Sequence, residues 1–172
     1  MIHANTSMTD VEVEIVTTKF DEPTGNSSVE FVITNYSGAD RWIVADKWFV
    51  WSQQQQMITL SFARTRHRRG VESFGYFLPE VEKMSPGVSL TRLTVLQWPL
   101  VLSAIWNDER SVWPPAGHYS LRIEIGYGIE PVPAIPARGE RLERIEEAIL
   151  NWQSRAISNV ADIMIPVRRA EK

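Results

Sequence analysis

The feature that most constrains the fold is a strict alternation of side chains over residues 119–127. Every second residue from Tyr119 to Tyr127 is large and apolar, and the residues between them are serine, arginine, glutamate and glycine. Successive side chains of a β-strand point to opposite faces, so the pattern predicts a strand with one buried face. A sheet with one apolar face has to bury it against another layer, which favours a layered β architecture.

The same period of two recurs along most of the chain. It is clearest over 10–16, 29–34, 57–64 and 89–97. Residues 41–51 are β-branched and aromatic and predict one long strand or two short ones, whereas 98–113 fits a strand and a helical turn equally well. Turn residues separate these segments, and the Pro86-Gly87 pair is typical of a type II turn. The chain is therefore predicted to be all-β, with seven to eight strands.

The period changes after the main strands, which span 10–128. Three prolines within 131–139 form a stiff connector that cannot join a central ladder. Over 140–156 the apolar residues recur at intervals of three and four, which predicts an amphipathic helix. These residues are Leu142, Ile145, Ile149, Trp152 and Ala156. Alternation returns over 158–168, so the helix would be inserted before a last strand, where it either covers the core or forms a seam with a partner.

Length and composition exclude several classes of protein. A chain of 172 residues can hold one domain with a sizeable core, so residues 1–172 are interpreted as a single domain. The chain has no cysteine, which excludes disulfides, thiolate zinc sites, iron–sulfur clusters and cysteine nucleophiles. Neither a signal peptide nor an apolar stretch of about 18–20 residues is recognisable. We therefore expect a cytoplasmic protein without a membrane span.

The densest group of positive charge lies in residues 64–69, where the candidate partner-binding residues are Arg64, Arg66, His67, Arg68 and Arg69. Removing the four arginines takes the formal net charge of the chain from −3 to −7, so the basic charge is local. A general nucleic-acid binder is basic over a whole face, which argues against that class. Guanidinium groups pair bidentately with carboxylates, so this group predicts contact with an acidic protein partner. The alternative is a solvated hairpin tip.

The segment Ala116–Leu121 (AGHYSL) resembles the entry to strand F of immunoglobulin-like and fibronectin type III sandwiches. In those folds a tyrosine hydroxyl bonds the backbone just upstream, a role that the resemblance gives to Tyr119. Leu121 stands where immunoglobulin domains carry their second cysteine, so the resemblance is to the cysteine-free relatives. It implies an immunoglobulin-like antiparallel β-sandwich.

Three short motifs are also similar to those of bacterial intracellular proteinase inhibitor domains. They are Asn35-Tyr36-Ser37, Pro86-Gly87 and the run from Pro115 to Tyr119. This second resemblance implies a bacterial protein. If it extends to function, it implies a proteinase as the partner, although a shared fold does not fix function.

Two further classes of function stay open. Trp106 and Trp113 bracket a polar turn and would form the ligand platform of a carbohydrate-binding module, unless they belong to the core. A hydrolase with an unrecognised carboxylate site also stays open, because the fold sets the distance between acids.

No positive signal for an enzyme is recognisable. The three histidines lack ligand spacing, and no nucleophile elbow, phosphate loop or dinucleotide fingerprint is present, so we expect no metal and no cofactor. The sequence therefore favours a non-catalytic protein-binding or assembly module, for example an inhibitor or accessory domain. Its expected contact surfaces are the arginine-rich segment and the edge strands, and an edge strand or the helix could also join copies into a homo-oligomer.

Overall fold

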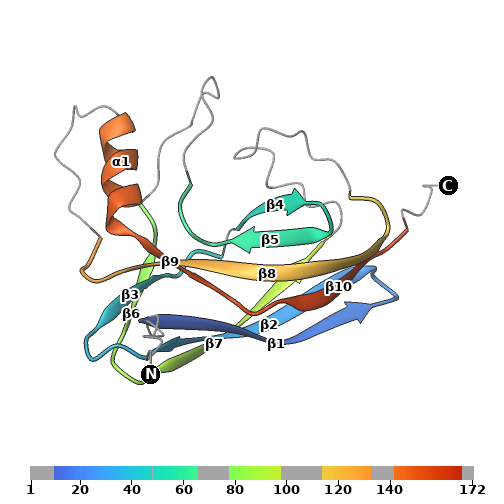
Figure 1. The fold of residues 1–172 in the computed structure, drawn as a ribbon, viewed down its shortest axis with the longest axis horizontal. Helices are drawn as coiled ribbons and strands as arrows, with labels where there is room; N and C mark the ends of the chain where they lie inside the picture. Colours follow the sequence, from blue (N-terminus) through green and yellow to red (C-terminus); the bar gives the residue numbers. More distant parts are fainter. Residues whose placement is uncertain (1–9, 48, 66–77, 98–113, 133–141, 168–172) are drawn as a thin grey trace, which may run out of the picture.

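The computed structural model describes residues 10–47, 49–65, 78–97, 114–132 and 142–167, which form mostly β-structure (Figure 1). The described strands are β1 (Val11–Asp21), β2 (Asn26–Asn35), β3 (Arg41–Val44), β4 (Val50–Gln54), β5 (Met57–Ser61), β6 (Val81–Met84), β7 (Ser89–Leu96), β8 (Gly117–Gly128), β9 (Ser154–Ile157) and β10 (Ala161–Ile165), and the described helix is α1 (Leu142–Trp152). The number of strands is ten within this part of the chain, more than the seven to eight predicted.

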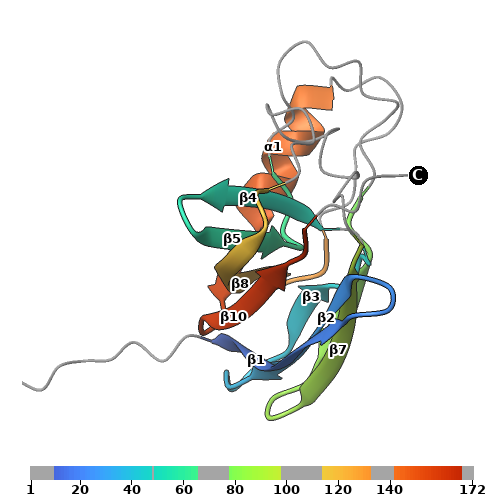
Figure 2. The same ribbon diagram turned by 90° about the vertical axis from the view of Figure 1, so that its right-hand side faces the viewer.

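The strands form two sheets that face each other (Figures 1 and 2). The smaller sheet has the order β1-β2-β7, and both of its pairings are antiparallel. The larger sheet has seven strands arranged around β8, which pairs with β3, β5, β9 and β10. The strand with the clearest alternation is thus the one that has the most neighbours.

One pairing contradicts the prediction of a purely antiparallel fold, because β5 runs parallel to β8 over residues 57–61 and 120–124. The β4–β5 hairpin lies between β3 and β6 in the chain but not in the sheet, where β3 pairs with β6 and β5 pairs with β8. The hairpin turns at Gln55, whose φ of 54° is positive, and so sends β5 back in the direction of β8. A period of two reports which face of a strand is buried but not the direction of its neighbours.

The core lies between the two sheets and takes side chains from both. The smaller sheet contributes Val11, Val13, Ile15, Val29, Phe31 and Ile33, and the larger one contributes Ile58, Leu60, Leu121, Ile123, Ile125, Ile163 and Ile165. Each of these residues is at most 5% exposed. Burying an aliphatic or aromatic side chain of this size stabilises the folded state by about 1.5–3 kcal/mol relative to leaving it in water.

The predicted helix over 140–156 ends earlier in the structure, at Trp152, and its last part is an unpredicted strand, β9, whereas the predicted last strand over 158–168 is present as β10. Ala156 fits the helical spacing, yet it is a buried residue of β9. Pairing with β8 overrides the local preference here: Ser158 N–H donates to the Ile123 carbonyl (2.9 Å), and Ile123 N–H donates to Ser158 Oγ (2.8 Å). The chain therefore leaves the helix in order to join the larger sheet.

The connection between β9 and β10, residues 158–160, bonds to the edge of the smaller sheet. Asn159, which lies in this connection, accepts from Ile15 N–H through Oδ1 (2.7 Å) and donates to the Ile15 carbonyl through Nδ2 (3.3 Å). The register of β1 against β2 shifts between Ile15 and Thr17, which marks a bulge at this point. Thr18 Oγ1 adds a bond to the Asp162 carbonyl (2.9 Å). The outer edge of β1 is therefore occupied by the other sheet.

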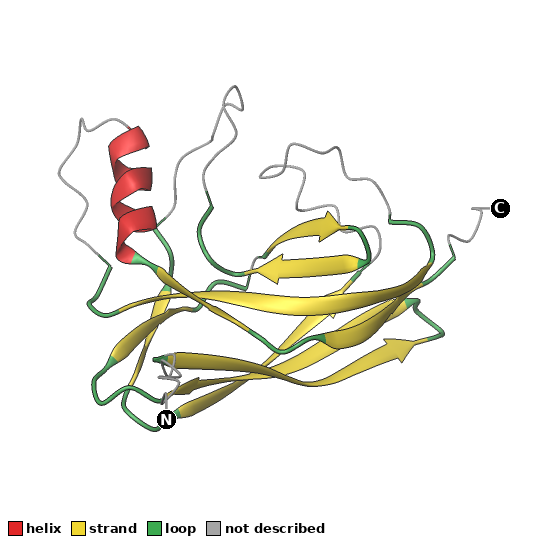
Figure 3. Cartoon of the chain, in the orientation of Figure 1, coloured by secondary structure: helices red, strands yellow, loops and turns green. Residues whose placement is uncertain are grey.

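Helix α1 docks on the C-terminal end of β8 (Figure 3). Ile149 is 1% exposed, and the indole Nε1 of Trp152 donates to the Glu130 carbonyl (2.8 Å). A Cβ atom at Gly128 would overlap the Trp152 ring, so the absence of a side chain there makes room for the indole. These contacts favour the first of the two expectations for the helix, that it packs on its own fold.

Candidate functional site

Only some of the candidate residues from the sequence belong to the part of the chain that the structure describes. Arg64 is described, whereas Arg66, His67, Arg68 and Arg69 lie outside that part of the chain, as do Trp106 and Trp113. What the structure describes is therefore the base from which the arginine-rich segment departs. We call this the loop base and define it as Asp46, Arg64, Glu124, Gln153 and Arg155.

The backbone of Arg64 is held by side chains that follow helix α1. Gln153 Nε2 donates to the Arg64 carbonyl (2.6 Å), and Gln153 Oε1 accepts from Arg64 N–H (2.9 Å). Arg155 Nη2 donates to the same carbonyl (3.0 Å), while its Nη1 pairs with Glu124 Oε1 (2.8 Å). A Cβ at Gly126 would lie 2.7 Å from Gln153 Oε1, so glycine leaves space for this amide. The clamp satisfies both backbone groups of one residue, as a neighbouring strand would.

The side chain of Arg64 makes an intramolecular ion pair. Its Nη2 lies 2.7 Å from Asp46 Oδ2, and the two side chains are only 18% and 10% exposed. Sequence reasoning grouped Arg64 with the other cations of the segment, but in the structure its charge is engaged by Asp46. Arg64 therefore contributes to the loop base, and its guanidinium is held by Asp46 and not presented to a partner.

A second arginine lies close to this ion pair. Arg92, on β7, donates through Nη1 to the Val44 carbonyl (2.8 Å), and its Nη2 lies 3.9 Å from Glu82 Oε2. Burial lowers the pKa of Arg92, against the opposing effects of Glu82 and Asp46. Burial also raises the pKa of Asp46 above its ordinary value of 3.8, although Arg64 acts in the opposite direction. Asp46 and Arg92 are thus both partly desolvated, and the bond from Arg92 on β7 to the Val44 carbonyl on β3 connects the two sheets beside the loop base.

The raised pKa of Asp46 predicts a specific pH dependence of stability. The folded chain retains the Asp46 proton to a higher pH than the unfolded chain, so the contribution of this group is full below pH 3.8 and is lost as the pH rises through its folded pKa. Because Asp46→Asn cannot titrate, the free energy of unfolding of the wild type minus that of the variant should fall across this window. Urea unfolding of both chains over a pH series measures the difference, and a difference that rises with pH would contradict the prediction.

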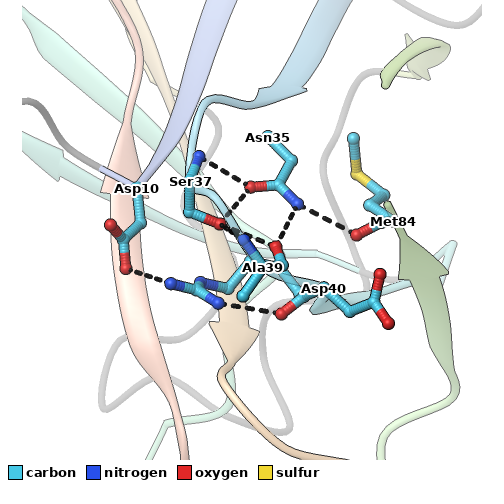
Figure 4. A network of polar contacts seen from close by, with 7 residues as sticks. Asp10, Asn35, Ser37, Ala39, Asp40 and Met84 are labelled. Atoms are coloured by element: carbon cyan, nitrogen blue, oxygen red, sulfur yellow. Dashed lines mark hydrogen bonds and ion pairs between the residues drawn. The ribbon is translucent and has the colours of Figure 1, made fainter. Parts of the chain in front are cut away.

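A second polar network lies where β2 turns into β3 (Figure 4). Asn35 is fully buried; its Nδ2 donates to the carbonyls of Ala39 and Met84 (2.9 Å each), and its Oδ1 accepts from the Ser37 hydroxyl (2.6 Å) and N–H (3.0 Å). Beside it, Arg41 Nη2 pairs with Asp10 Oδ2 (2.7 Å). Every polar atom of the Asn35 side chain is satisfied within the fold, so this amide stabilises the turn.

Tyr119 lies on the inner face of β8 and is 5% exposed. Its hydroxyl donates to the Pro115 carbonyl (2.9 Å), four residues upstream in the chain. The bond closes the segment that leads into β8 and satisfies a phenol that would otherwise be desolvated without a partner. Its role within the described residues is structural.

The amide clamp is the part of the loop base that sequence reasoning missed. Gln153 directly follows the helical stripe and reads as a solvent-exposed residue, since nothing local indicates that Arg64 will lie beside it. The only available signal was Gly126 within the clearest strand, because a glycine inside a strand often marks a close approach by another group.

Several comparisons and geometric criteria bear on function. No group of three or more histidine, cysteine, aspartate or glutamate residues within the described ranges could hold a metal ion. In the same ranges no helix has the length and apolar character needed to cross a membrane. No protein-family model matches the chain, and no curated protein matches it.

Proposed function

We propose that this chain is a non-catalytic protein-binding or assembly module built on an immunoglobulin-like β-sandwich. Two observations support the fold part of the proposal: the apolar faces of two sheets meet in a shared core, and the Tyr119 hydroxyl makes the upstream backbone contact of a tyrosine corner. The inserted β4–β5 hairpin and helix α1 are additions to that pattern.

The double anchoring of Arg64 carries the functional part of the proposal. A residue whose backbone is held by Gln153 and whose side chain is held by Asp46 starts the arginine-rich segment from a fixed point. Fixing a binding segment at its base lowers the entropy that is lost when it binds a partner. The three arginines that follow, Arg66, Arg68 and Arg69, would then pair with carboxylates of an acidic protein surface.

Affinity capture with a matched pair of variants tests this function. The first variant carries Arg66→Ser, Arg68→Ser and Arg69→Ser, and it keeps Arg64 because the loop base needs it. The control carries Lys19→Ser, Lys47→Ser and Lys83→Ser, which removes the same charge from exposed positions outside the arginine-rich segment. We expect the wild type and the control to retain the same partners from a lysate of the source cells, and the first variant to lose them.

Identifying the captured proteins shows which class of partner the arginine-rich segment binds. If the resemblance to the intracellular proteinase inhibitor type extends to function, the lost partner is a proteinase, and adding the wild-type chain slows its peptide hydrolysis. Identical partner sets for the wild type and the arginine variant would contradict the role of the arginine-rich segment. Loss of partners by the lysine control as well would show only a dependence on total charge.

A further inference from the structure

Strand β7 forms the outer edge of the smaller sheet (Figure 2). It pairs with β2 over eight residues, Ser89–Leu96, without a register shift, and no described residue pairs with its other side. Proteins usually protect such an edge with lysine, proline, a bulge, an inward-pointing charge or a short strand. Within the described residues β7 has one of these features, the inward-facing Arg92, but its guanidinium is 18% exposed, donates to the Val44 carbonyl and lies close to Glu82, so its charge is engaged within the fold.

The other described edges are protected. The edge of β1 has a bulge after Ile15 and is bonded by Asn159 from the larger sheet. At the edges of the larger sheet, β4 and β10 have five residues each and β6 and β9 have four, with Glu82 and Lys83 exposed on β6. Addition of a strand is therefore favoured at β7, and among the described strands an assembly that uses β7 has no second open edge of similar length through which to continue.

The side chains of β7 indicate which strand fits. Its outward residues are Ser89, Thr91, Leu93 and Val95, all uncharged, and the two apolar ones are 66% and 48% exposed. Further from the edge the same face carries Glu30 on β2 and Glu12, Glu14 and Lys19 on β1, so it is acidic in balance. Two copies laid face to face would oppose these carboxylates, whereas two copies joined at β7 keep those of β1 apart by the full width of both sheets.

We propose that a second copy of this chain pairs antiparallel with β7, so that the smaller sheets of the two copies become continuous across a two-fold axis. When Leu93 of one copy lies opposite Leu93 of the other, Thr91 of each copy faces Val95 of the other and Arg92 of each copy faces Thr94. No like charges then meet across the axis, and the apolar side chains pack together. Both strands have the same length, so their ladders end together. This contact deepens the proposed assembly role and rests on it.

The contact is small and the dimer is correspondingly weak. One pair of strands buries less surface than a standard interface, so we expect a dissociation constant on the order of 100 µM. Sedimentation equilibrium of the full chain from about 10 µM to about 1 mM spans this range. The average mass should rise with concentration from 19.7 kDa toward twice that value and no further.

Two substitutions locate the contact. Leu93→Lys places two like charges opposite each other and should keep the chain at the monomer mass throughout. Val16→Lys is the matched control, because Val16 is similarly exposed (53%) but lies at the β1 bulge, and this variant should dimerise as the wild type does. Circular dichroism of both variants checks that they are folded.

A rescue experiment separates charge repulsion from other effects of the substitution. An equal mixture of Leu93→Lys and Leu93→Glu chains places opposite charges across the two-fold axis and should recover association, although neither variant associates alone. A wild type that stays monomeric to about 1 mM, or a Leu93→Lys chain that dimerises like the wild type, would overturn the proposal. A monomer that instead binds a strand of another protein at β7 would overturn it too.

This test is independent of the one for the arginine-rich segment. The variant with serine at positions 66, 68 and 69 leaves β7 unchanged, so it should lose its acidic partners and still dimerise. Loss of captured partners by that variant and loss of dimerisation by Leu93→Lys are therefore separate results, and either hypothesis can fail without the other.

Discussion

Replacing Gly128 with alanine is expected to lower the free energy of unfolding by about 2–3 kcal/mol, because the added methyl group would occupy the place of the Trp152 ring. The indole cannot move away without losing its bond to the Glu130 carbonyl, and its movement would disturb the buried Ile149 one turn earlier in α1. Urea unfolding followed by circular dichroism measures the loss. Tryptophan fluorescence of the folded variant should also shift, since the environment of the ring changes.

Gly38→Ala is the matched control for this prediction. Gly38 lies in the turn before β3, where an added Cβ would meet no atom within 4 Å, and its φ is not in the left-handed region. We expect this control to unfold within about 0.5 kcal/mol of the wild type. Backbone entropy alone would make either alanine variant slightly more stable, so an equal loss at both glycines would contradict displacement of Trp152 as the specific cause.

The parts of the fold that the sequence predicts well are those set by local rules. Alternation over 10–16 correctly placed Val11, Val13 and Ile15 in the core. The Pro86-Gly87 pair forms the expected turn, with Gly87 at a φ of 75° and Val88 N–H donating to the Ser85 carbonyl (3.2 Å). In each case one neighbour along the chain or one face of a strand is enough to determine the outcome.

The parts that the sequence does not predict depend on residues far apart in the chain. Ala156 continues a helical spacing, but the bonds between Ser158 and Ile123 bring this segment into a strand. Similarly, the direction of β5 follows from a hairpin whose partner, β8, comes much later in the sequence. Local propensity is a weak prior that tertiary pairing overrides at such positions.

The candidate site shows the same limit. The sequence treats Arg64 as one of four equivalent cations, because charge density is all that a local reading measures. Its true environment comes from Asp46 on one side and from Gln153 on the other, and neither residue is near it in the chain. Polar side chains that clamp a backbone look like ordinary surface residues until the fold brings the two segments together.

Replacing Asn35 with alanine should cost about 3 kcal/mol of stability, since the Asn35 amide is the centre of the network in Figure 4. The substitution leaves the Met84 carbonyl without the Asn35 amide and removes the two bonds that Ser37 makes to Asn35 Oδ1. Asn35→Asp should be at least as destabilising at neutral pH, because a carboxylate would face two carbonyl oxygens to which the amide now donates. Urea unfolding at pH 7 measures both losses.

The comparison with an exposed asparagine tests whether burial and bonding are the cause. Asn151 lies on the exposed side of α1, so Asn151→Ala should change the free energy of unfolding by no more than about 0.5 kcal/mol. If Asn35→Ala were as mild as this control, the turn between β2 and β3 would have to be held by its backbone bonds alone, chiefly those joining Asn35 to Gly87 and Val88. A large loss at Asn35 with none at Asn151 would instead identify the amide as the group that fixes the path of the chain from one sheet to the other.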